Sequence, residues 1–217
     1  MTADLDILNR VSTSTISDAL DRHGINGQAL GIKPLDRSFR IIGRAFTLKY
    51  TSVGAVRGTV GDFIDDLGPG DVVAIDNNGR MDATIWGDIL TLVASRRGVS
   101  GTIIDGICRD TDRALELGYP IFARGNAMRS GKDRVMLEAT QVPVNIGGVR
   151  VQPGDIVFGD GDGVVIVPKE REDDVLKAAA DIEAAEERIR EAVMSGMRLD
   201  EARKKNAYYD LQKRIES

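Results

Sequence analysis

Histidine and cysteine are almost absent from this 217-residue sequence, which contains one residue of each. The single histidine, His23, excludes a zinc site built from several histidines of one chain. No Gly-x-Ser-x-Gly motif accompanies it, so the sequence does not indicate a Ser-His-Asp hydrolase of that type. The single cysteine, Cys108, excludes an internal disulfide, and we therefore expect a cytoplasmic protein.

Long apolar runs are absent as well. No stretch approaches the about 20 apolar residues that a membrane-spanning helix requires, and the polar N-terminus has no signal-peptide pattern. Basic residues are fewer than acidic ones: the sequence has 29 lysines and arginines and 34 aspartates and glutamates, which gives a formal net charge of −5. An acidic surface repels the phosphates of nucleic acids. We therefore expect a compact soluble protein that binds neither membranes nor nucleic acids.

Two glycine-rich segments lack the context that a nucleotide-binding loop needs. Gly159 to Gly163 is followed by the β-branched run Val164 to Val167, which predicts a strand, whereas dinucleotide and methyl-donor loops lead into a helix. The segment from Gly58 to Gly70 does not end in Gly-Lys-Ser or Gly-Lys-Thr, so it is not a phosphate loop. Neither segment supports a nucleotide cofactor.

The spacing of apolar residues predicts a mixed α/β organisation. We expect an opening helix over residues 5–22, a strand over residues 40–50 and a short helix within residues 55–67. Short strands should follow between residues 134 and 167, where proline and glycine recur as turn signals. The chain should thus change from strands joined by helices to a β-rich second half.

Residues 169–217 have the pattern of an amphipathic helical extension. An apolar stripe runs from Val175 to Val193, and glutamate and arginine fill the opposite face. Ser195-Gly196 interrupts the stripe, and a second helix is expected over residues 199–215. We expect an α/β catalytic domain over residues 1–168, with this extension at a subunit interface, because an appended helical hairpin with an apolar stripe needs a surface to cover it. The alternative is that the extension packs on its own domain.

A strand, a helix and a second strand are predicted between residues 71 and 105. Residues 71–76 are an apolar run bounded by turn residues, as in a buried strand. Within residues 83–97 the apolar residues have helical spacing, at Ile85, Ile89, Leu92 and Val93. Gly98 is a helix stop signal, and residues 101–105 form the next strand. The two strands should be parallel and joined by a right-handed crossover.

This order places three charged residues at one edge of the sheet. Arg109 and Asp110 follow the second strand, and Asp88 lies near the start of the intervening helix. Open α/β sheets bind ligands at the carboxyl ends of their strands. Asp88, Arg109 and Asp110 are therefore the candidate site residues.

The three residues suit one kind of chemistry. Unpaired amides at a helix N-terminus bind a carboxylate, and the arginine fork binds a carboxylate or an enolate oxygen. One carboxylate can hold Mg²⁺ or Mn²⁺, and a second can move a proton. Together these groups would form and protonate the enolate of a small 2-oxo acid with the help of a metal. From the spacing alone, a loop ion pair and a carboxylate that complements the helix dipole are the plainer explanation.

The segment from Trp86 to Asp110 resembles the signature of the class II pyruvate aldolases, in which an aspartate precedes an Arg-Asp pair at this spacing. Those enzymes cleave 4-hydroxy-4-methyl-2-oxoglutarate and 4-carboxy-4-hydroxy-2-oxoadipate, and they share a fold with the regulator of ribonuclease activity A. The resemblance extends to four flanking segments, Ile16–Leu20, Pro120–Gly125, Pro153–Val157 and Asp162–Val165. It implies an α/β fold of the swivelling β/β/α sandwich type with a C-terminal helical tail.

The resemblance also implies a role for each candidate residue. Asp110 would hold the metal, mainly through bound waters, and Arg109 would bind the pyruvyl group and stabilise the enolate. Asp88 would orient or activate the water that protonates the enolate. The backbone amides of Ile89 and Leu90 would bind the substrate carboxylate.

The family forms trimers or hexamers, and a glutamate from the C-terminal region of one subunit completes the site of its neighbour. Glu183, Glu186 and Glu187 are the candidates for that residue in this chain. The implied activity is divalent-metal-dependent cleavage of a 4-hydroxy-2-oxo acid to pyruvate and a second 2-oxo acid. Oxaloacetate decarboxylation would accompany it, and the implied setting is the degradation of aromatic acids.

Two other functions stay open. A non-catalytic regulator that binds and inhibits a ribonuclease could keep the Arg-Asp pair, as relatives of the same fold can. A class I aldolase would need a Schiff-base lysine, for which Lys49 is the one candidate, although an exposed strand-edge position is the preferred interpretation.

The remaining chemically distinctive residues have plainer interpretations. Cys108 could act as a thiolate beside Arg109, but we expect a small buried residue. His23 should lie at the C-terminal end of the opening helix as a charge partner. Residues 54–57 and the pair Asn77-Asn78 could recognise the part of the substrate beyond its pyruvyl group.

Overall fold

The structure is a computed structural model that describes residues 5–55, 58–206, 208 and 213. The chain divides into two compact units. Residues 28–169 form the first, here called the sheet unit, and the residues before 28 join those after 169 in the second, here called the helical unit. All the described strands belong to the sheet unit.

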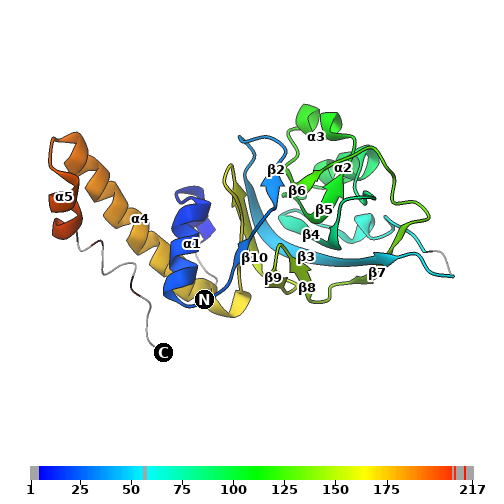
Figure 1. The fold of residues 1–217 in the computed structure, drawn as a ribbon, viewed down its shortest axis with the longest axis horizontal. Coiled ribbons are helices and arrows are strands. Elements are labelled where there is room, and N and C mark those ends of the chain that lie inside the picture. Colours follow the sequence, from blue (N-terminus) through cyan, green and yellow to red (C-terminus); the bar gives the residue numbers. More distant parts are fainter. Residues whose placement is uncertain (1–4, 56–57, 207, 209–212, 214–217) are drawn as a thin grey trace. The chain divides into compact units, whose positions relative to one another are not determined.

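A nine-stranded sheet is the frame of the sheet unit (Figure 1). Its strands follow the order β1-β11-β10-β3-β4-β5-β6-β2, with β7 paired to β3 off this path. Their bounds are β1 Gln28–Ala29, β2 Lys33–Pro34, β3 Ile41–Ser52, β4 Asp71–Arg80, β5 Gly101–Cys108, β6 Ile121–Asn126, β7 Val135–Thr140, β10 Ile156–Asp160 and β11 Gly163–Val167. β3, β4, β5 and β6 pair in parallel, and the outer strands pair antiparallel.

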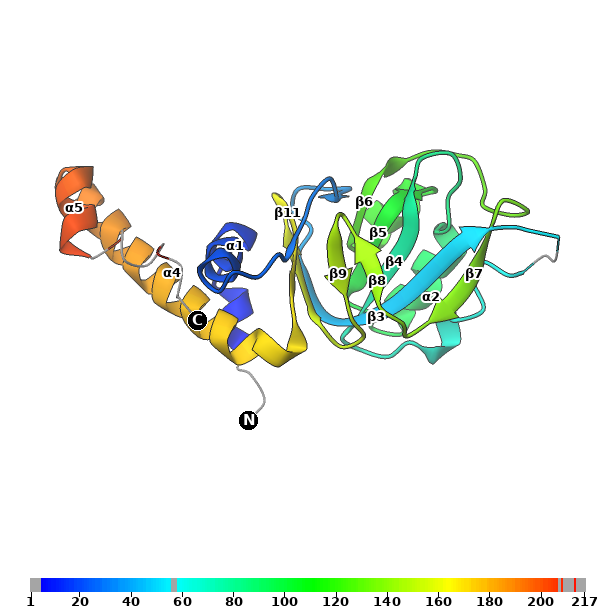
Figure 2. The ribbon, with the colours of Figure 1, turned by 60° about the horizontal axis from the view of Figure 1, so that its bottom comes forward.

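Helices cover one face of this sheet and a small hairpin covers the other, as the two views in Figures 1 and 2 show. Helix α2 (Asp88–Arg96) joins β4 to β5, and α3 (Thr111–Leu117) joins β5 to β6. The hairpin consists of β8 (Val144–Ile146) and β9 (Val149–Val151). The layers are therefore hairpin, sheet and helices, which confirms the β/β/α sandwich that the resemblance implied and the parallel β4–β5 pair that the sequence pattern predicted.

Alternation along the strands builds two cores, because successive side chains of a strand point to opposite faces. On β4, Val73 and Ile75 belong to the core that includes Trp86 and Ala94 of the helical face. Val72 and Ala74 belong to the second core, beneath the β8–β9 hairpin. Both faces of β4 are buried, as expected for a central parallel strand, and this explains its continuous apolar run.

The ends of the strand order are close in sequence. β1 and β2 are the two edge strands, yet only residues 30–32 separate them. Three residues span at most roughly 10 Å, so the sheet curls until its edges approach each other. The curl leaves little exposed edge for unwanted pairing.

Helix α2 begins later than the sequence predicted. Residues 83–87, expected as its first turns, form no helix, because Ile85 and Trp86 are buried and Thr84 forms a bridge with Ser130. The expected apolar stripe is also wrong: Ile89 is 72% exposed, whereas Thr91 and Ala94 are buried. The predicted stop is confirmed, since α2 ends at Arg96 and Gly98 adopts a φ of +73°.

Two other helix predictions need correction. Within residues 55–67 the described helix is a single 3₁₀ turn, η2 (Ile64–Asp66), because the glycines of this segment disfavour a longer one. The opening helix is divided into η1 (Leu5–Asn9) and α1 (Thr13–Arg22), because the Ser12 side chain accepts a hydrogen bond from the Thr15 amide at 3.1 Å and caps a new helix there.

In the helical unit, α1 packs against the long helix α4 (Glu172–Met194), which follows the 3₁₀ turn η3 (Lys169–Arg171). Val175, Ala179 and Ile182 of the predicted stripe are buried, and the chain breaks at Ser195-Gly196 as expected. The next helix, α5 (Leu199–Lys205), covers only the first part of the predicted range; most residues from 207 to 215 lie outside the described structure. None of the described helices combines the length and apolarity needed to cross a bilayer.

A buried aspartate stabilises the turn before β10. Gln152 to Asp155 form a turn with Pro153 in its second position and Gly154 at a φ of +87° in its third, a sequence that favours type II turns. The Asp155 carboxylate is buried and accepts hydrogen bonds from the amides of Gln152 (2.7 Å) and Lys169 (2.9 Å).

We expect Asp155→Ala to lower the free energy of unfolding by about 2–4 kcal/mol, because two amides lose their acceptor in a buried environment. Urea denaturation measures the difference. Glu116→Ala is the control, since Glu116 forms an exposed ion pair with Arg113 worth about 0.5 kcal/mol or less. Equal losses in the two variants would contradict the role given to Asp155.

Candidate active site at the N-terminus of helix α2

Two loops meet where β5 ends and α2 begins. The Arg109 amide donates a hydrogen bond to the Trp86 carbonyl at 3.0 Å, which joins the backbones of the two loops. Asp110 follows in the left-handed region, with a φ of 55°, a conformation that non-glycine residues rarely adopt. This turn brings the Asp110 carboxylate toward α2, and its Oδ2 accepts a hydrogen bond from the Asp88 amide at 3.3 Å.

The side chains of Arg109 and Asp110 form an ion pair at the same place. Arg109 Nε lies 3.3 Å from Asp110 Oδ2, and the two side chains are 40% and 39% exposed. Both groups are therefore accessible to a ligand from solvent. The structure thus brings together Arg109, Asp110 and the start of α2, with Asp88 as the first residue of that helix.

Gly87 allows this close approach. A Cβ atom at this position would lie 2.7 Å from Asp110 Oδ2 and 3.2 Å from Arg109 Nε, distances that would displace both side chains. Its backbone is extended, with a φ of −150°, so space rather than backbone conformation requires glycine here. A side chain at position 87 would therefore force Asp110 Oδ2, and to a lesser extent Arg109 Nε, to move.

A cavity of about 260 Å³ opens beside these groups. Its lining comes from the segments around residues 60, 87 and 130: Val60, Gly61, Thr84, Ile85, Trp86, Gly87, Asp88, Ile89, Leu90, Arg109, Ser130 and Gly131. Most of these side chains are apolar, whereas Asp88 and Arg109 supply charge. The cavity therefore suits a small ligand with an anionic group at Arg109 and the start of α2.

The sequence interpretation missed two of these walls, around Val60-Gly61 and Ser130-Gly131. Both reach the site by tertiary contacts. Thr84 donates to the Arg129 carbonyl at 3.0 Å from both its amide and its hydroxyl, and a Cβ at Gly61 would lie 3.4 Å from the Leu90 side chain. A Cβ at Gly131 would lie 2.3 Å from the Thr84 carbonyl oxygen, so a glycine is required there as well. A lone glycine in a loop carries no signal that distinguishes this close contact from an ordinary turn.

Asp110 offers the kind of ligand that a hard divalent cation prefers. Mg²⁺ usually keeps several waters and binds to one or two carboxylates, and a half-exposed carboxylate beside a cavity fits that requirement. Among the described residues, no group of three or more His, Cys, Asp and Glu side chains could enclose a metal. A metal bound here would therefore take most of its ligands from water and substrate.

The sequence matches the family described as RraA-like, Aldolase/RraA, over residues 13–166. The chain belongs to this Aldolase/RraA family. Protein DlpA of Legionella pneumophila is 40% identical over 94% of the chain, which spans only 34% of DlpA. A Halalkalibacterium halodurans protein named "Putative 4-hydroxy-4-methyl-2-oxoglutarate aldolase" is 35% identical over 89% of this chain and 93% of its own.

Solved structures of the family have the same fold. An uncharacterized protein from Pseudomonas syringae pv. tomato is 42% identical, with a TM-score of 0.86 over 92% of this chain and 96% of its own. RraAS2 of Streptomyces coelicolor, described as an unusual member of the RNase ES inhibitor RraA protein family, is 33% identical. Its TM-score is 0.79 over 84% of this chain and 94% of its own.

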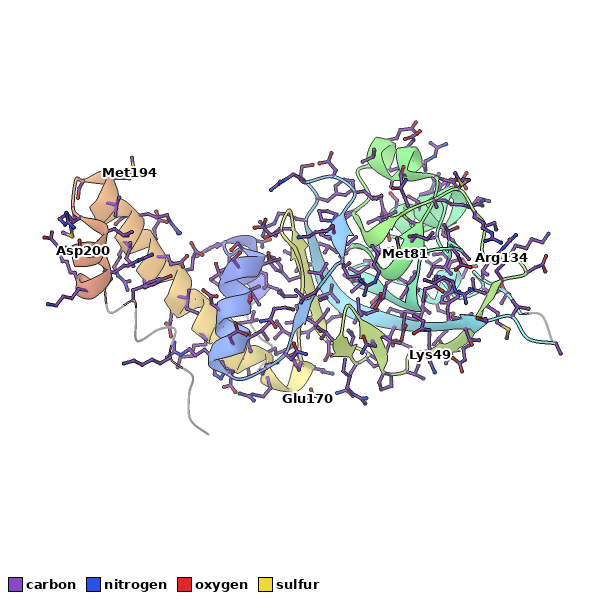
Figure 3. The ribbon with its side chains drawn as sticks, in the orientation of Figure 1. Lys49, Met81, Arg134, Glu170, Met194 and Asp200 are labelled. Carbon is purple, nitrogen blue, oxygen red and sulfur yellow. The ribbon has the colours of Figure 1, made fainter. Side chains whose placement is uncertain are left out.

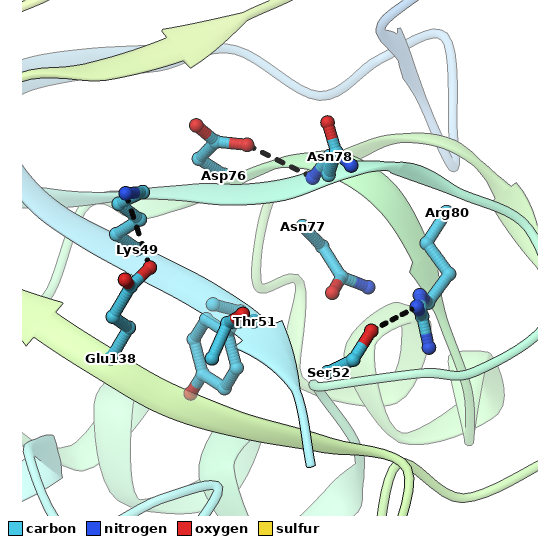
Figure 4. A pocket seen from close by; sticks show the side chains of 9 residues that line it. Lys49, Thr51, Ser52, Asp76, Asn77, Asn78, Arg80 and Glu138 are labelled. Atoms are coloured by element: carbon cyan, nitrogen blue, oxygen red, sulfur yellow. Dashed lines mark hydrogen bonds and ion pairs between the residues drawn. The ribbon is translucent and has the colours of Figure 1, made fainter. Parts of the chain in front are cut away.

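A second cavity of about 340 Å³ lies between β3, β4 and β7 in this Aldolase/RraA protein (Figure 4). Asn77 and Asn78, considered above for substrate recognition, line this second cavity. Lys49, which is also labelled in Figure 3, is 45% exposed and pairs with Glu138 at 3.1 Å. An exposed, paired ammonium is unlike the desolvated lysine that a Schiff base requires, so the structure does not favour the class I alternative. Val56 and Arg57 lie outside the described residues.

His23 and the three candidate glutamates lie in the helical unit. His23 lies directly after α1, as predicted, and its Nδ1 is 3.3 Å from an Arg171 guanidinium nitrogen. Glu183, Glu186 and Glu187 all lie on α4 and contact Arg190.

Of the three glutamates, Glu183 also accepts a hydrogen bond from the Thr15 hydroxyl at 3.0 Å. The pKa of Glu186 is raised, chiefly by burial and then by the nearby Glu183.

Cys108 is fully buried at the end of β5, and its Sγ lies 3.8 Å from the Gly125 carbonyl oxygen. Burial, together with the nearby Asp110 carboxylate, raises the pKa of the Cys108 thiol to about 11. The thiol is therefore protonated at neutral pH, which argues against a thiolate nucleophile and confirms the buried position expected from the sequence.

We expect iodoacetamide to modify Cys108 of the folded protein slowly at about pH 8 and faster as the pH approaches about 11, since the thiolate is the reacting species. The pKa of Cys108 is higher in the folded protein than in the unfolded chain. The free energy of unfolding should therefore fall as the pH rises from about 8 to about 11. Mass spectrometry follows the modification, with the protein unfolded in guanidinium chloride as control. Equal rates in the folded and unfolded protein would contradict the assignment.

Proposed function

We propose that this protein is a divalent-metal-dependent lyase that cleaves a 4-hydroxy-2-oxo acid to pyruvate and a second 2-oxo acid. One observation carries the proposal: the Arg109–Asp110 ion pair lies at the N-terminus of α2, beside a cavity of suitable size. The family name and the name of the 35% identical relative support the same activity.

The start of α2 would bind the carboxylate of the pyruvyl group. The first backbone hydrogen bond of the helix runs from the Thr91 amide to the Gly87 carbonyl at 3.0 Å. The amides of Ile89 and Leu90 precede that bond, as the first amides of every helix do, and both residues line the cavity. A helix N-terminus also carries partial positive charge, which favours an anion there.

Arg109 would then lie beside the 2-oxo group of the bound substrate. When the bond between C3 and C4 breaks, its electrons move onto C3 and the 2-oxo oxygen, and the guanidinium stabilises this enolate. A base removes the proton of the 4-hydroxyl group, and that oxygen becomes the carbonyl of the departing 2-oxo acid. Asp88 would orient or activate the water that returns a proton to C3, which yields pyruvate.

Asp110 would hold a divalent cation, Mg²⁺ or Mn²⁺, which supplies Lewis-acid stabilisation of negative charge on the substrate oxygens. The Asp88 amide and Arg109 fix the Asp110 carboxylate, so its position would not depend on the metal alone. Oxaloacetate should lose carbon dioxide at the same site, because that reaction also produces the pyruvate enolate.

A ribonuclease regulator is the second candidate function, favoured by the 33% identity to RraAS2. Such a protein would act by docking on a ribonuclease, and Arg109 and Asp110 would have no chemical step to perform. Inhibition of a ribonuclease at stoichiometric protein, without pyruvate release, would favour this candidate over the lyase.

The first test couples pyruvate release to lactate dehydrogenase, with 4-hydroxy-4-methyl-2-oxoglutarate and oxaloacetate as substrates. We expect pyruvate in the presence of Mg²⁺ or Mn²⁺ and none in EDTA, because the cation stabilises the charge that develops in the transition state. Silence with both substrates and folded, metal-supplied protein would contradict the lyase. Pyruvate release that survives EDTA and is trapped by borohydride would instead indicate a Schiff base.

Arg109→Ala and Asp110→Ala should each lower kcat by about 100–1000-fold, the usual effect of removing one electrostatic stabiliser of a transition state. Both side chains are half-exposed, so the melting temperature should change little. Arg113→Ala is the matched control, because Arg113 is an exposed arginine of the adjacent helix α3 that pairs with Glu116. Near-normal turnover in either site variant would remove the residue from the mechanism.

A further inference from the structure

The peptide group between Gly87 and Asp88 is bound at both ends. Its N–H donates to Asp110 Oδ2 at 3.3 Å. Its carbonyl oxygen accepts two hydrogen bonds from Thr91, one from the amide at 3.0 Å and one from the hydroxyl at 2.8 Å. A single peptide plane therefore connects the Thr91 side chain to the carboxylate of the candidate site.

The direction of these bonds is set by chemistry. The Trp86 indole Nε1 lies 2.9 Å from the Thr91 hydroxyl, and an indole N–H can only donate. The hydroxyl therefore accepts from Trp86 and uses its own proton for the Gly87 carbonyl. Trp86 and Thr91 are both about 1% exposed, so water does not compete for these bonds.

Trp86 is itself held by a second aromatic ring. Its ring stacks on Tyr119, with ring centroids 6.2 Å apart and planes 3° from parallel. Tyr119 in turn forms a hydrogen bond with Thr102 at 2.8 Å in the core. The Trp86 carbonyl also accepts the Arg109 amide, so this residue contacts both loops of the site.

We propose that Thr91 is a positioning residue for Asp110, acting through the Gly87–Asp88 peptide and oriented by the Trp86 indole. Donation to a carbonyl polarises the peptide and strengthens the hydrogen bond made by its N–H, here the bond to Asp110. The chain of bonds runs from the Trp86 indole through the Thr91 hydroxyl and the peptide to the carboxylate. This inference rests on the proposed role of Asp110 in holding the metal.

A purely structural role for the Thr91 hydroxyl makes a different prediction. Threonine often bonds to the carbonyl four residues earlier in a helix, and the effect of such a bond is confined to the local helix geometry. Loss of that bond would alter stability and leave metal affinity unchanged. Loss of a positioning bond would alter metal affinity, because groups that orient a ligand typically contribute about 10–100-fold to affinity or activity.

The test compares Thr91→Val, which keeps the shape and removes the hydroxyl, with Thr91→Ser, which keeps the hydroxyl. Thr47→Val is the matched control, because Thr47 is a buried threonine whose hydroxyl donates to the Val142 carbonyl at 2.6 Å, outside the candidate site. For each full-length variant, Mn²⁺ affinity is measured by electron paramagnetic resonance of the free ion. The kcat and KM for pyruvate release and the melting temperature complete the comparison.

We expect Thr91→Val to weaken Mn²⁺ binding and lower kcat by about 10–100-fold, with a smaller change in KM. Thr91→Ser should recover most of both losses, and Thr47→Val should lose stability alone. Wild-type Mn²⁺ affinity in folded Thr91→Val would overturn the proposal, as would equal losses in Thr91→Val and Thr91→Ser. If Thr91→Val does not fold, Thr91→Ala, with a residue that favours helix, takes its place under the same criteria.

Failure of the proposed function would be recognised separately. If the wild type releases no pyruvate yet binds Mn²⁺, the affinities of the variants still decide whether Thr91 positions Asp110. If the wild type also binds no Mn²⁺, crystal structures of the wild type and of Thr91→Val show whether loss of the hydroxyl moves Asp110. A separation of Asp88 N and Asp110 Oδ2 that stays at 3.3 Å without the hydroxyl would overturn the proposal, and a longer one would support it.

Discussion

The parallel pairing of β4 with β5 is the constraint on which the rest of the sheet unit depends. Its register, from Val72 opposite Gly101 to Asp76 opposite Asp105, places the carboxyl ends of both strands at one edge. A parallel pair requires a crossover, and α2 supplies it, so the N-terminus of the helix must begin where β5 ends. The meeting of the Asp88 amide with the Asp110 carboxylate follows from that connection.

The second constraint is steric: Arg109 and Asp110 must come close to the N-terminus of α2. Two positions solve the steric problem differently: Gly87 omits a side chain, and Asp110 adopts a left-handed conformation that costs energy. Strain of that kind persists only where surrounding contacts hold it, and the Arg109 amide and the Trp86 carbonyl provide one such contact. The buried bonds of Trp86 and Thr91 then connect this strained turn to the core.

Relatives of this chain carry different functional names: one is named a putative aldolase, and another is described as a member of a ribonuclease inhibitor family. A fold shared at this level does not decide between them, because function depends on the site rather than on the fold. In this chain the candidate site combines an accessible arginine and carboxylate with a cavity and a helix N-terminus, and the lyase proposal depends on that combination.

The sequence by itself determined the parallel β4–β5 pair, the turn at Gly159–Gly163 and the break at Ser195-Gly196, because each depends on local periodicity or on turn residues. The layer order came from the resemblance to the family, not from those patterns. Its motif also singled out Asp88, Arg109 and Asp110, which lie together at the start of α2, while their roles stay predictions. Tertiary structure alone decided that α2 begins at Asp88. The apolar spacing predicted a helix already from residue 83, but burial of Trp86 in the core keeps the residues before Asp88 out of the helix. Tertiary structure alone also brought the walls at Val60 and Ser130 to the cavity, because contacts between residues far apart in the chain leave no local pattern.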